Sequence, residues 1–170
     1  MKKEFWSSAA LDGLLLALVC IVMTLIEAAK LNLGTAINIV LQIGQIVATI
    51  WMLLYFMKRY GAEQEQYPYS SAFKYGFLTS LCSNVIILAY MLLHYTLIFP
   101  DAMSPESIVE AIQQYSPNAD ISLYESLAGY MPLIAAFGAF IMYTIWAAII
   151  SAILASFAKR ETSIFQTEEE

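Results

Sequence analysis

The fold of this chain is decided by residues 5–28, which read FWSSAALDGLLLALVCIVMTLIEA. The stretch is apolar along most of its length, and as an α-helix it is long enough to cross the roughly 30 Å hydrocarbon layer of a bilayer. Lys2 and Lys3 precede it, as basic residues precede the apolar core of a secretory signal. The apolar run is too long for a signal peptide, however, and no clean small-x-small cleavage site follows it. We therefore predict an uncleaved first transmembrane helix.

Three more apolar runs follow, and the composition of the whole chain agrees with a membrane protein. Hydrophobic residues make up 60% of the sequence and charged residues 13%, whereas soluble domains carry roughly 25% charged residues. Four spans of about 20 residues each would use roughly half of the 170 residues, so the sequence predicts one all-α transmembrane domain without a separate soluble domain. The predicted spans cover residues 5–28, 36–57, 73–99 and 132–157, with an outer loop at 100–131 and a tail at 158–170.

The distribution of basic residues predicts the orientation of the spans. Seven of the eight Lys and Arg residues lie where the cytoplasmic ends of four spans would be, and residues 101–130 contain no Lys or Arg. Because short cytoplasmic loops are enriched in Lys and Arg, we expect a multi-pass membrane protein with both termini in the cytoplasm. The net charge of −6 comes mainly from the outer loop and the tail, which argues against a nucleic-acid partner. The seven residues are Lys2, Lys3, Lys58, Arg59, Lys74, Lys159 and Arg160.

The outer loop contains two helix-start signals. Ser104 is followed by Pro105 and Glu106, an order typical of a capped first turn. Ser122 is followed three residues later by Glu125, which is a capping-box pattern. We expect two short amphipathic helices on the outer surface, between the third and fourth spans.

Polar side chains line one face of the second predicted span. Asn38, Gln42, Gln45 and Thr49 follow one another at spacings of four, three and four residues, which places them on one side of a helix. They have two interpretations: hydrogen bonds that hold neighbouring helices together, or the lining of a substrate path or partner groove.

One ionisable residue, Asp12, lies in the inner third of the first span. A charged group inside a span costs free energy, and residues that carry one often have a functional role. Asp12 either pairs structurally, for example with an amide of the second span, or takes part in proton- or cation-linked chemistry. The candidate intramembrane polar site consists of Asp12, Asn38, Gln42, Gln45, Thr49 and Asn84.

The fourth span carries small residues four positions apart, which let another helix approach closely. Some of these residues must pack inside the bundle, and the others are available to a second copy of the chain or to a partner helix. The candidate helix-packing face consists of Ala148, Ser151, Ala152 and Ala155.

Motifs for catalysis and cofactor binding are missing from the sequence. It contains no H-E-x-x-H, no glycine-rich phosphate loop and no G-x-S-x-G. His94 is the single histidine and has no Cys or His neighbour to complete a metal site. We therefore expect no catalytic residues, no cofactor and no metal, and a protein that is not an enzyme.

Three segments resemble a known family. Residues 67–77 read YPYSSAFKYGF, residues 98–101 read IFPD, and residues 149–154 read IISAIL before Lys159 and Arg160. Together they resemble a domain-of-unknown-function family of small four-span inner-membrane proteins from Bacteroides-type bacteria. The resemblance implies a four-helix membrane fold, a location in the bacterial inner membrane and no assigned activity. It also implies a membrane-associated glycosyltransferase as a candidate partner. It supplies no catalytic residues.

Two functions are therefore open. The first is a non-enzymatic accessory or scaffold subunit that docks a membrane-associated partner within the bilayer. The second is a small homo-oligomeric transporter or channel, with a polar path near Asp12, Gln42 and Gln45. The lipid bilayer is a partner in both.

Overall fold

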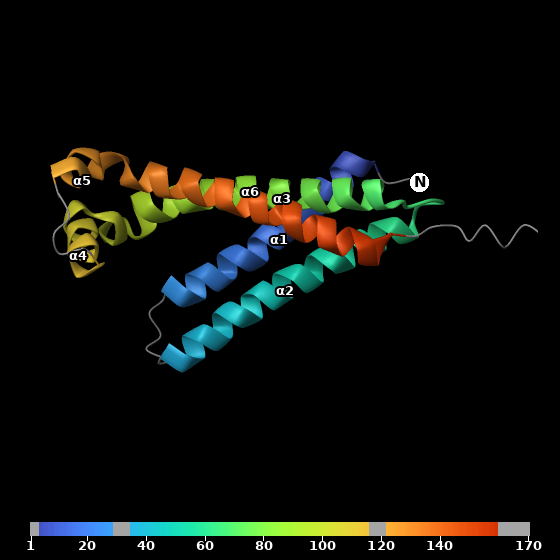
Figure 1. Cartoon of the computed structure of the whole chain (residues 1–170), viewed down its shortest axis with the longest axis horizontal. Helices are drawn as coiled ribbons and strands as arrows, with labels where there is room; N and C mark the ends of the chain where they lie inside the picture. The colour runs from blue at the N-terminus through green and yellow to red at the C-terminus, as the bar shows by residue number, and fades with distance from the viewer. Residues whose placement is uncertain (1–3, 29–34, 116–121, 160–170) are drawn as a thin grey trace, which may run out of the picture. The chain divides into compact units, whose positions relative to one another are not determined.

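The computed structural model describes residues 4–28, 35–115 and 122–159, and in these residues every regular element is a helix. Four of the helices are long and apolar enough to cross a membrane, which confirms the prediction of an all-α, four-span protein. Figure 1 shows them as the four long ribbons. They are α1 (Phe5–Ala28), α2 (Thr35–Ala62), α3 (Tyr69–Leu93) and α6 (Met131–Ala158).

Two of the long helices extend by several residues beyond the predicted spans, and α6 extends by one residue at each end. Helix α2 continues from the predicted end at Met57 to Ala62 and therefore includes Lys58 and Arg59. Lys and Arg favour helical conformation, and their long side chains can reach the interface from inside a span. Helix α3 begins at Tyr69, four residues before the predicted start, and passes into a π-helical turn, η1 (His94–Ile98).

Short helices connect the third and fourth spans. The backbone N–H of Ser107 donates a hydrogen bond of 3.2 Å to Oγ of Ser104, so Ser104 occupies the cap position that its sequence context indicates. Residues 116–121 of the predicted outer loop lie outside the described residues. The connecting helices are η2 (Pro100–Met103), α4 (Pro105–Tyr115), α5 (Ser122–Leu127) and η3 (Ala128–Tyr130).

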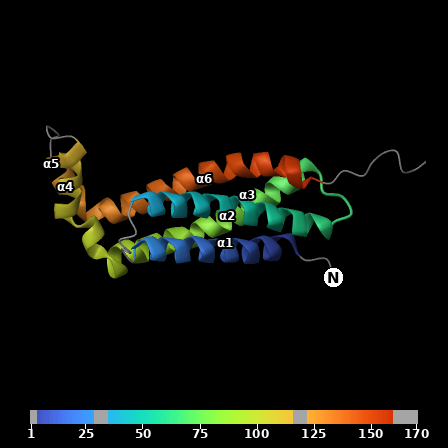
Figure 2. The same cartoon turned by 90° about the horizontal axis from the view of Figure 1, so that it is seen from below.

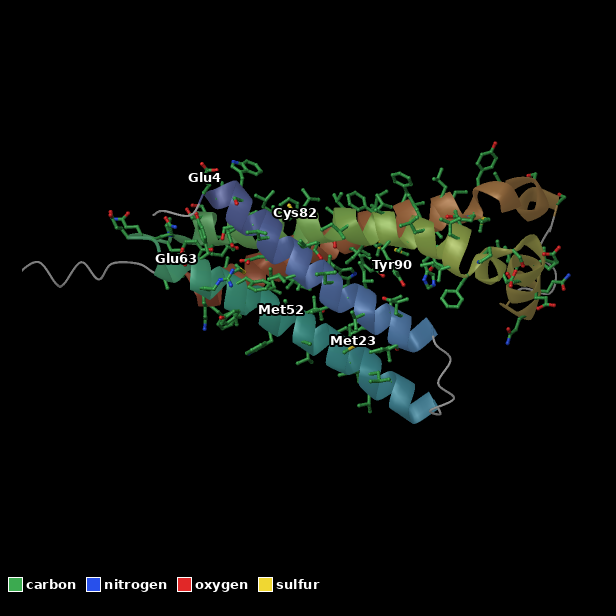
Figure 3. The ribbon with its side chains drawn as sticks, turned by 180° about the vertical axis from the view of Figure 1, so that it is seen from behind. Glu4, Met23, Met52, Glu63, Cys82 and Tyr90 are labelled. Atoms are coloured by element: carbon green, nitrogen blue, oxygen red, sulfur yellow. The ribbon has the colours of Figure 1, made fainter. Side chains whose placement is uncertain are left out.

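The chain divides into two compact units. The first consists of Met1–Asn84 with Thr144–Glu170, and the second of Val85–Tyr143. In the first unit α1 and α2 lie side by side and run antiparallel (Figures 1 and 2). Figure 3 places Glu4 and Glu63 at the same end of this unit.

The start of α1, the end of α2, the start of α3 and the end of α6 all lie at this end (Figure 1). The exposed residues Lys58, Lys74 and Lys159 belong to these helix ends, so we call it the basic end of the first unit.

Glycines bring the helices of the first unit close together. A Cβ atom on Gly13 of α1 would lie 2.6 Å from the carbonyl oxygen of Thr79 and 2.7 Å from Cβ of Cys82. The backbones of α1 and α3 therefore touch at this point, as small residues allow in membrane helices. Gly76 of α3 has the same role toward α2 and α6, because its Cβ would lie 2.8 Å from Sδ of Met57 and 3.3 Å from Oγ of Ser151.

Candidate functional site

The carboxylate of Asp12 is the centre of the candidate site. Its side chain is only 1% exposed, although α1 is a membrane-spanning helix. Oδ1 accepts a hydrogen bond from Nη2 of Arg59 on α2, which also forms an ion pair with it. Oδ2 accepts a hydrogen bond of 2.6 Å from the hydroxyl of Tyr75 on α3. One buried carboxylate thus connects three helices.

Tyr75 extends this network back to α1. Its hydroxyl lies 3.0 Å from Oγ of Ser8, which is also buried. The ring of Tyr75 stacks on Tyr60, with centroids 4.1 Å apart and planes 8° apart, and the edge of Phe5 packs nearby. These rings exclude water and hold the hydroxyl in place. We call the four hydrogen-bonded residues, Ser8, Asp12, Arg59 and Tyr75, the Asp12 clamp.

Away from Asp12, the side chain of Arg59 is partly exposed and lies against two aromatic rings. Its side chain is 37% exposed, and its Cζ atom lies 5.2 Å from the ring centroid of Phe56 and 6.0 Å from that of Tyr55. The guanidinium therefore neutralises a buried carboxylate and also faces one buried ring, Phe56, and one exposed ring, Tyr55. Removing one member of such a pair leaves the other uncompensated, which is the main energetic consequence of a buried ion pair.

The Asp12 clamp corrects one detail of the sequence interpretation. An amide of the second span was one example of a structural partner for Asp12, whereas the structure pairs the carboxylate with Arg59. The sequence interpretation placed Arg59 just beyond the span, as a marker of orientation. The extension of α2 to Ala62 makes Arg59 part of the helix, and its long side chain reaches back to the carboxylate. Ser8 and Tyr75 were not among the candidate site residues predicted from the sequence.

The polar residues of α2 do not join this clamp. Gln45 lies 14 residues before Arg59 in the same helix, which corresponds to about 21 Å along the axis. The hydroxyl of Thr49 donates to the carbonyl oxygen of Gln45 at 2.8 Å and lies 3.8 Å from Sγ of Cys20, so Thr49 faces α1. Gln42 is exposed and Gln45 half-buried, and the side chain of Asn38 lies outside the described residues. Gln42 and Gln45 therefore lie apart from the Asp12 clamp along the bundle.

A second group of buried polar side chains lies on α3. Thr79, Ser80, Ser83 and Asn84 are all buried. Within the described part of the chain, Oγ1 of Thr79, Nδ2 of Asn84 and Oγ of Ser151 have no hydrogen-bond partner. Of these residues only Asn84 belonged to the predicted polar site. The buried stripe begins one turn after Tyr75, and it is the polar region nearest to the clamp along α3.

The predicted packing face of α6 is used at least partly inside the first unit. Ser151 and Ala155 are fully buried, and Ser151 packs against Gly76 of α3. The carbonyl oxygen of Ala152 accepts a hydrogen bond of 3.1 Å from the hydroxyl of Tyr69. Ala148 and Ala152 are half-buried. This face therefore brings α6 and α3 together within one chain.

The second unit holds the single histidine. The hydroxyl of Tyr90 lies 3.0 Å from Nδ1 of His94, and the rings of Tyr95 and Phe99 have centroids 5.2 Å and 4.9 Å from its ring. The histidine is buried in the π-helical turn, among aromatic rings rather than metal ligands. No group of three His, Cys, Asp or Glu side chains suited to a metal occurs among the residues that the structure describes.

Comparison with known proteins identifies the family. A family model described as "Protein of unknown function (DUF4199)" matches residues 11–160. The chain belongs to this family. Its membership in DUF4199 confirms the resemblance to a four-span family of unknown function, and the matched range includes Asp12, Arg59 and Tyr75 of the clamp. No curated protein and no solved structure matches the chain.

Proposed function

We propose that this DUF4199 protein is a non-enzymatic accessory or scaffold subunit that binds a membrane-associated partner within the bilayer. In this proposal it is a multi-pass protein of the bacterial inner membrane, with its basic end and both termini in the cytoplasm and short amphipathic helices on the outer face. The observation that carries the proposal is the exposed amide of Gln42 on α2.

Gln42 lies in the apolar stretch Ile39–Ala62, three residues or about 4.5 Å from its start. Its neighbours Ile39, Val40 and Ile43 are exposed apolar side chains, which suit lipid. An amide among them is better satisfied by a polar group of another helix, because lipid chains offer no hydrogen bonds. This supports a helix of another polypeptide at Gln42.

The Asp12 clamp supports the non-enzymatic part of the proposal. Both oxygens of the carboxylate accept hydrogen bonds, and Arg59 balances its charge. A carboxylate so engaged acts as a connection between helices. A membrane-associated glycosyltransferase, which the family resemblance suggests, is the first partner to test.

The test is purification of the tagged protein from its native host into nanodiscs, followed by native mass spectrometry. We expect a second polypeptide at fixed stoichiometry with the unchanged protein. Gln42→Leu should remove it, because the substitution keeps the volume and deletes the hydrogen-bonding amide. Ile43→Leu is the matched control on the same exposed surface and should retain the partner. A lone chain, or a complex that Gln42→Leu leaves intact, would contradict the scaffold proposal.

A homo-oligomer without a second polypeptide would favour a different function, a small transporter or channel. The buried hydroxyls and amide of Thr79, Asn84 and Ser151 support this alternative, because unpartnered polar atoms inside a bundle are typical of a hydrated path. The path would follow α3 from the Asp12 clamp instead of the distant Gln42 and Gln45.

The transporter alternative is tested by proton and sodium flux in proteoliposomes. Asp12→Asn should abolish flux through such a path. Thr79→Val should reduce it without unfolding the bundle, because the valine has the same shape and the hydroxyl has no partner among the described residues. Flux equal to that of empty vesicles in the unchanged protein would exclude the alternative.

A further inference from the structure

Three side chains of α2 form a continuous stack on the surface of the first unit. Trp51, Tyr55 and Arg59 follow one another at intervals of four residues, and so lie on one face of the helix. The rings of Trp51 and Tyr55 stack with centroids 6.0 Å apart and planes 17° apart. Cζ of Arg59 lies 6.0 Å from the centroid of Tyr55.

This stack is open to its surroundings. Trp51 is 67% and Tyr55 50% exposed, and Arg59 is 37% exposed. The adjacent side chain of Lys58 is exposed as well. The surface therefore combines two aromatic rings, on the bilayer side, with two cationic groups at the basic end.

The Asp12 clamp fixes the guanidinium in position. A guanidinium has five N–H donors, and the hydrogen bond to Oδ1 of Asp12 uses one of them. Because the carboxylate and the rings of Tyr55 and Phe56 hold the group, less side-chain entropy is lost when it binds a second anion. Arg59 is thus a pre-organised donor at the membrane surface.

The dimensions of the stack correspond to part of one lipid molecule. Trp51 and Arg59 are eight residues apart, or about 12 Å along the helix. A phosphate at Arg59 would therefore leave an acyl chain alongside Tyr55 and Trp51. The cytoplasmic leaflet, where the proposed orientation places the basic end, is rich in anionic lipid.

We propose that this surface binds one anionic phospholipid. Arg59 and Lys58 bind the phosphate of its headgroup, and Tyr55 and Trp51 contact the glycerol region and one acyl chain. Charge complementarity favours an anionic lipid over a zwitterionic one. The Arg59–Asp12 ion pair is neutral as a whole, and Lys58 adds one positive charge, which matches the single net negative charge of an anionic lipid.

The test measures which lipid touches Trp51. Trp6→Phe with Trp146→Phe leaves Trp51 as the single tryptophan of the three in the sequence. The protein is reconstituted in two vesicle preparations of equal overall composition, one with brominated phosphatidylglycerol and one with brominated phosphatidylcholine. We expect the anionic lipid to be about fivefold enriched at Trp51 in the quenching data, and high salt to reduce this preference. Excess inorganic phosphate should not displace the lipid, because it lacks the acyl contacts.

Substitutions in the stack and at Lys58 locate the site. Lys58→Gln and Tyr55→Ala change exposed side chains and should bring the enrichment close to one. Arg59→Lys keeps the charge but loses the planar donor group, and should lower the enrichment by part of that amount. Lys74→Gln removes a charge from another helix at the same end and serves as the matched control.

Three outcomes would overturn the proposal. Equal quenching by both brominated lipids would mean that the surface does not select an anionic headgroup. An equal loss with Lys74→Gln would mean that net charge alone attracts the lipid. Absence of quenching by either lipid would mean that protein, such as a second copy of the chain, covers Trp51.

Discussion

The hydroxyl of Tyr75 donates a hydrogen bond of 2.6 Å to Oδ2 of Asp12, although 63 positions separate the two residues in the chain. The same carboxylate accepts from Arg59, which is 47 positions away. Asp12 therefore connects α1 to both α2 and α3 at the basic end of the first unit. Because a buried ion pair stabilises only while both partners are present, the integrity of this end should depend on all members of the clamp together.

The coupling between Asp12 and Arg59 can be measured in a double-mutant cycle. Asp12→Ala should lower the free energy of unfolding by about 3 kcal/mol, since it leaves Arg59 without its counter-charge. Arg59→Ala should have a similar effect, and the double substitution should be less damaging than the sum, with a coupling of about 1–3 kcal/mol. The measurement is reversible unfolding in mixed detergent micelles. Strictly additive effects would show that the ion pair contributes nothing.

Tyr75→Phe isolates the hydroxyl of the clamp. The ring and its stacking on Tyr60 remain, while the hydrogen bonds to Asp12 and Ser8 are lost. We expect a loss of about 1–3 kcal/mol in unfolding free energy, because a charged acceptor is left with one donor fewer. Ser8→Ala, which keeps the bond from Tyr75 to Asp12, is the control and should cost about 1 kcal/mol or less. The reverse order of the two effects would contradict the described network.

The close approach of α1 and α3 can be tested by substituting Gly13, with Gly44 of α2 as the matched control. Gly13→Ala should destabilise the protein by about 1–3 kcal/mol, because the new Cβ would lie 2.6 Å from the carbonyl oxygen of Thr79. Gly44→Ala in α2 meets nothing within 4 Å and should be neutral or stabilise by up to about 1 kcal/mol. Thermal unfolding of both variants in the same detergent tests this. Equal effects would show that α1 and α3 do not touch at Gly13.

Tyr67 lies between α2 and α3 and predicts an unusual pH dependence. Its ring packs against Gly61, its hydroxyl has no hydrogen-bond partner within the described segments, and burial raises the pKa of this hydroxyl above its usual value. Since the folded state holds the proton more tightly, its contribution to stability is complete below about pH 10 and is lost as the pH rises further.

The corresponding variant is Tyr67→Phe. It should be as stable as the original protein at neutral pH, or more stable by about 1 kcal/mol, because it removes a buried polar group without a partner. Above pH 10 it should lose stability less steeply than the unchanged chain, as followed by circular dichroism across the pH range. A large loss at neutral pH would indicate that the hydroxyl has a partner after all.

Much of the fold can be predicted from the sequence, because a bilayer requires each span to be apolar and about 20 residues long. Residues 5–28 are apolar for the length of a span and form α1 with the predicted bounds. The signal fails at the helix ends: α2 continues past Met57 through Lys58 and Arg59, since charged side chains at an interface do not interrupt a helix. For the candidate site, the sequence pointed to Asp12 because a carboxylate inside a membrane costs free energy. The prediction also grouped Asp12 with Gln42 and Gln45, which lie too far from it along the helix axes to contact it.

The sequence by itself determined the class of the protein, because the length and apolar character of each span are local properties that can be counted along the chain. Only the tertiary structure decided the partners of Asp12. Arg59 and Tyr75 come from two other helices, and their approach depends on the crossing at Gly13 and on the packing of Tyr60 against Tyr75. Such contacts depend on helix rotation and on how far a long side chain reaches, which no local pattern encodes.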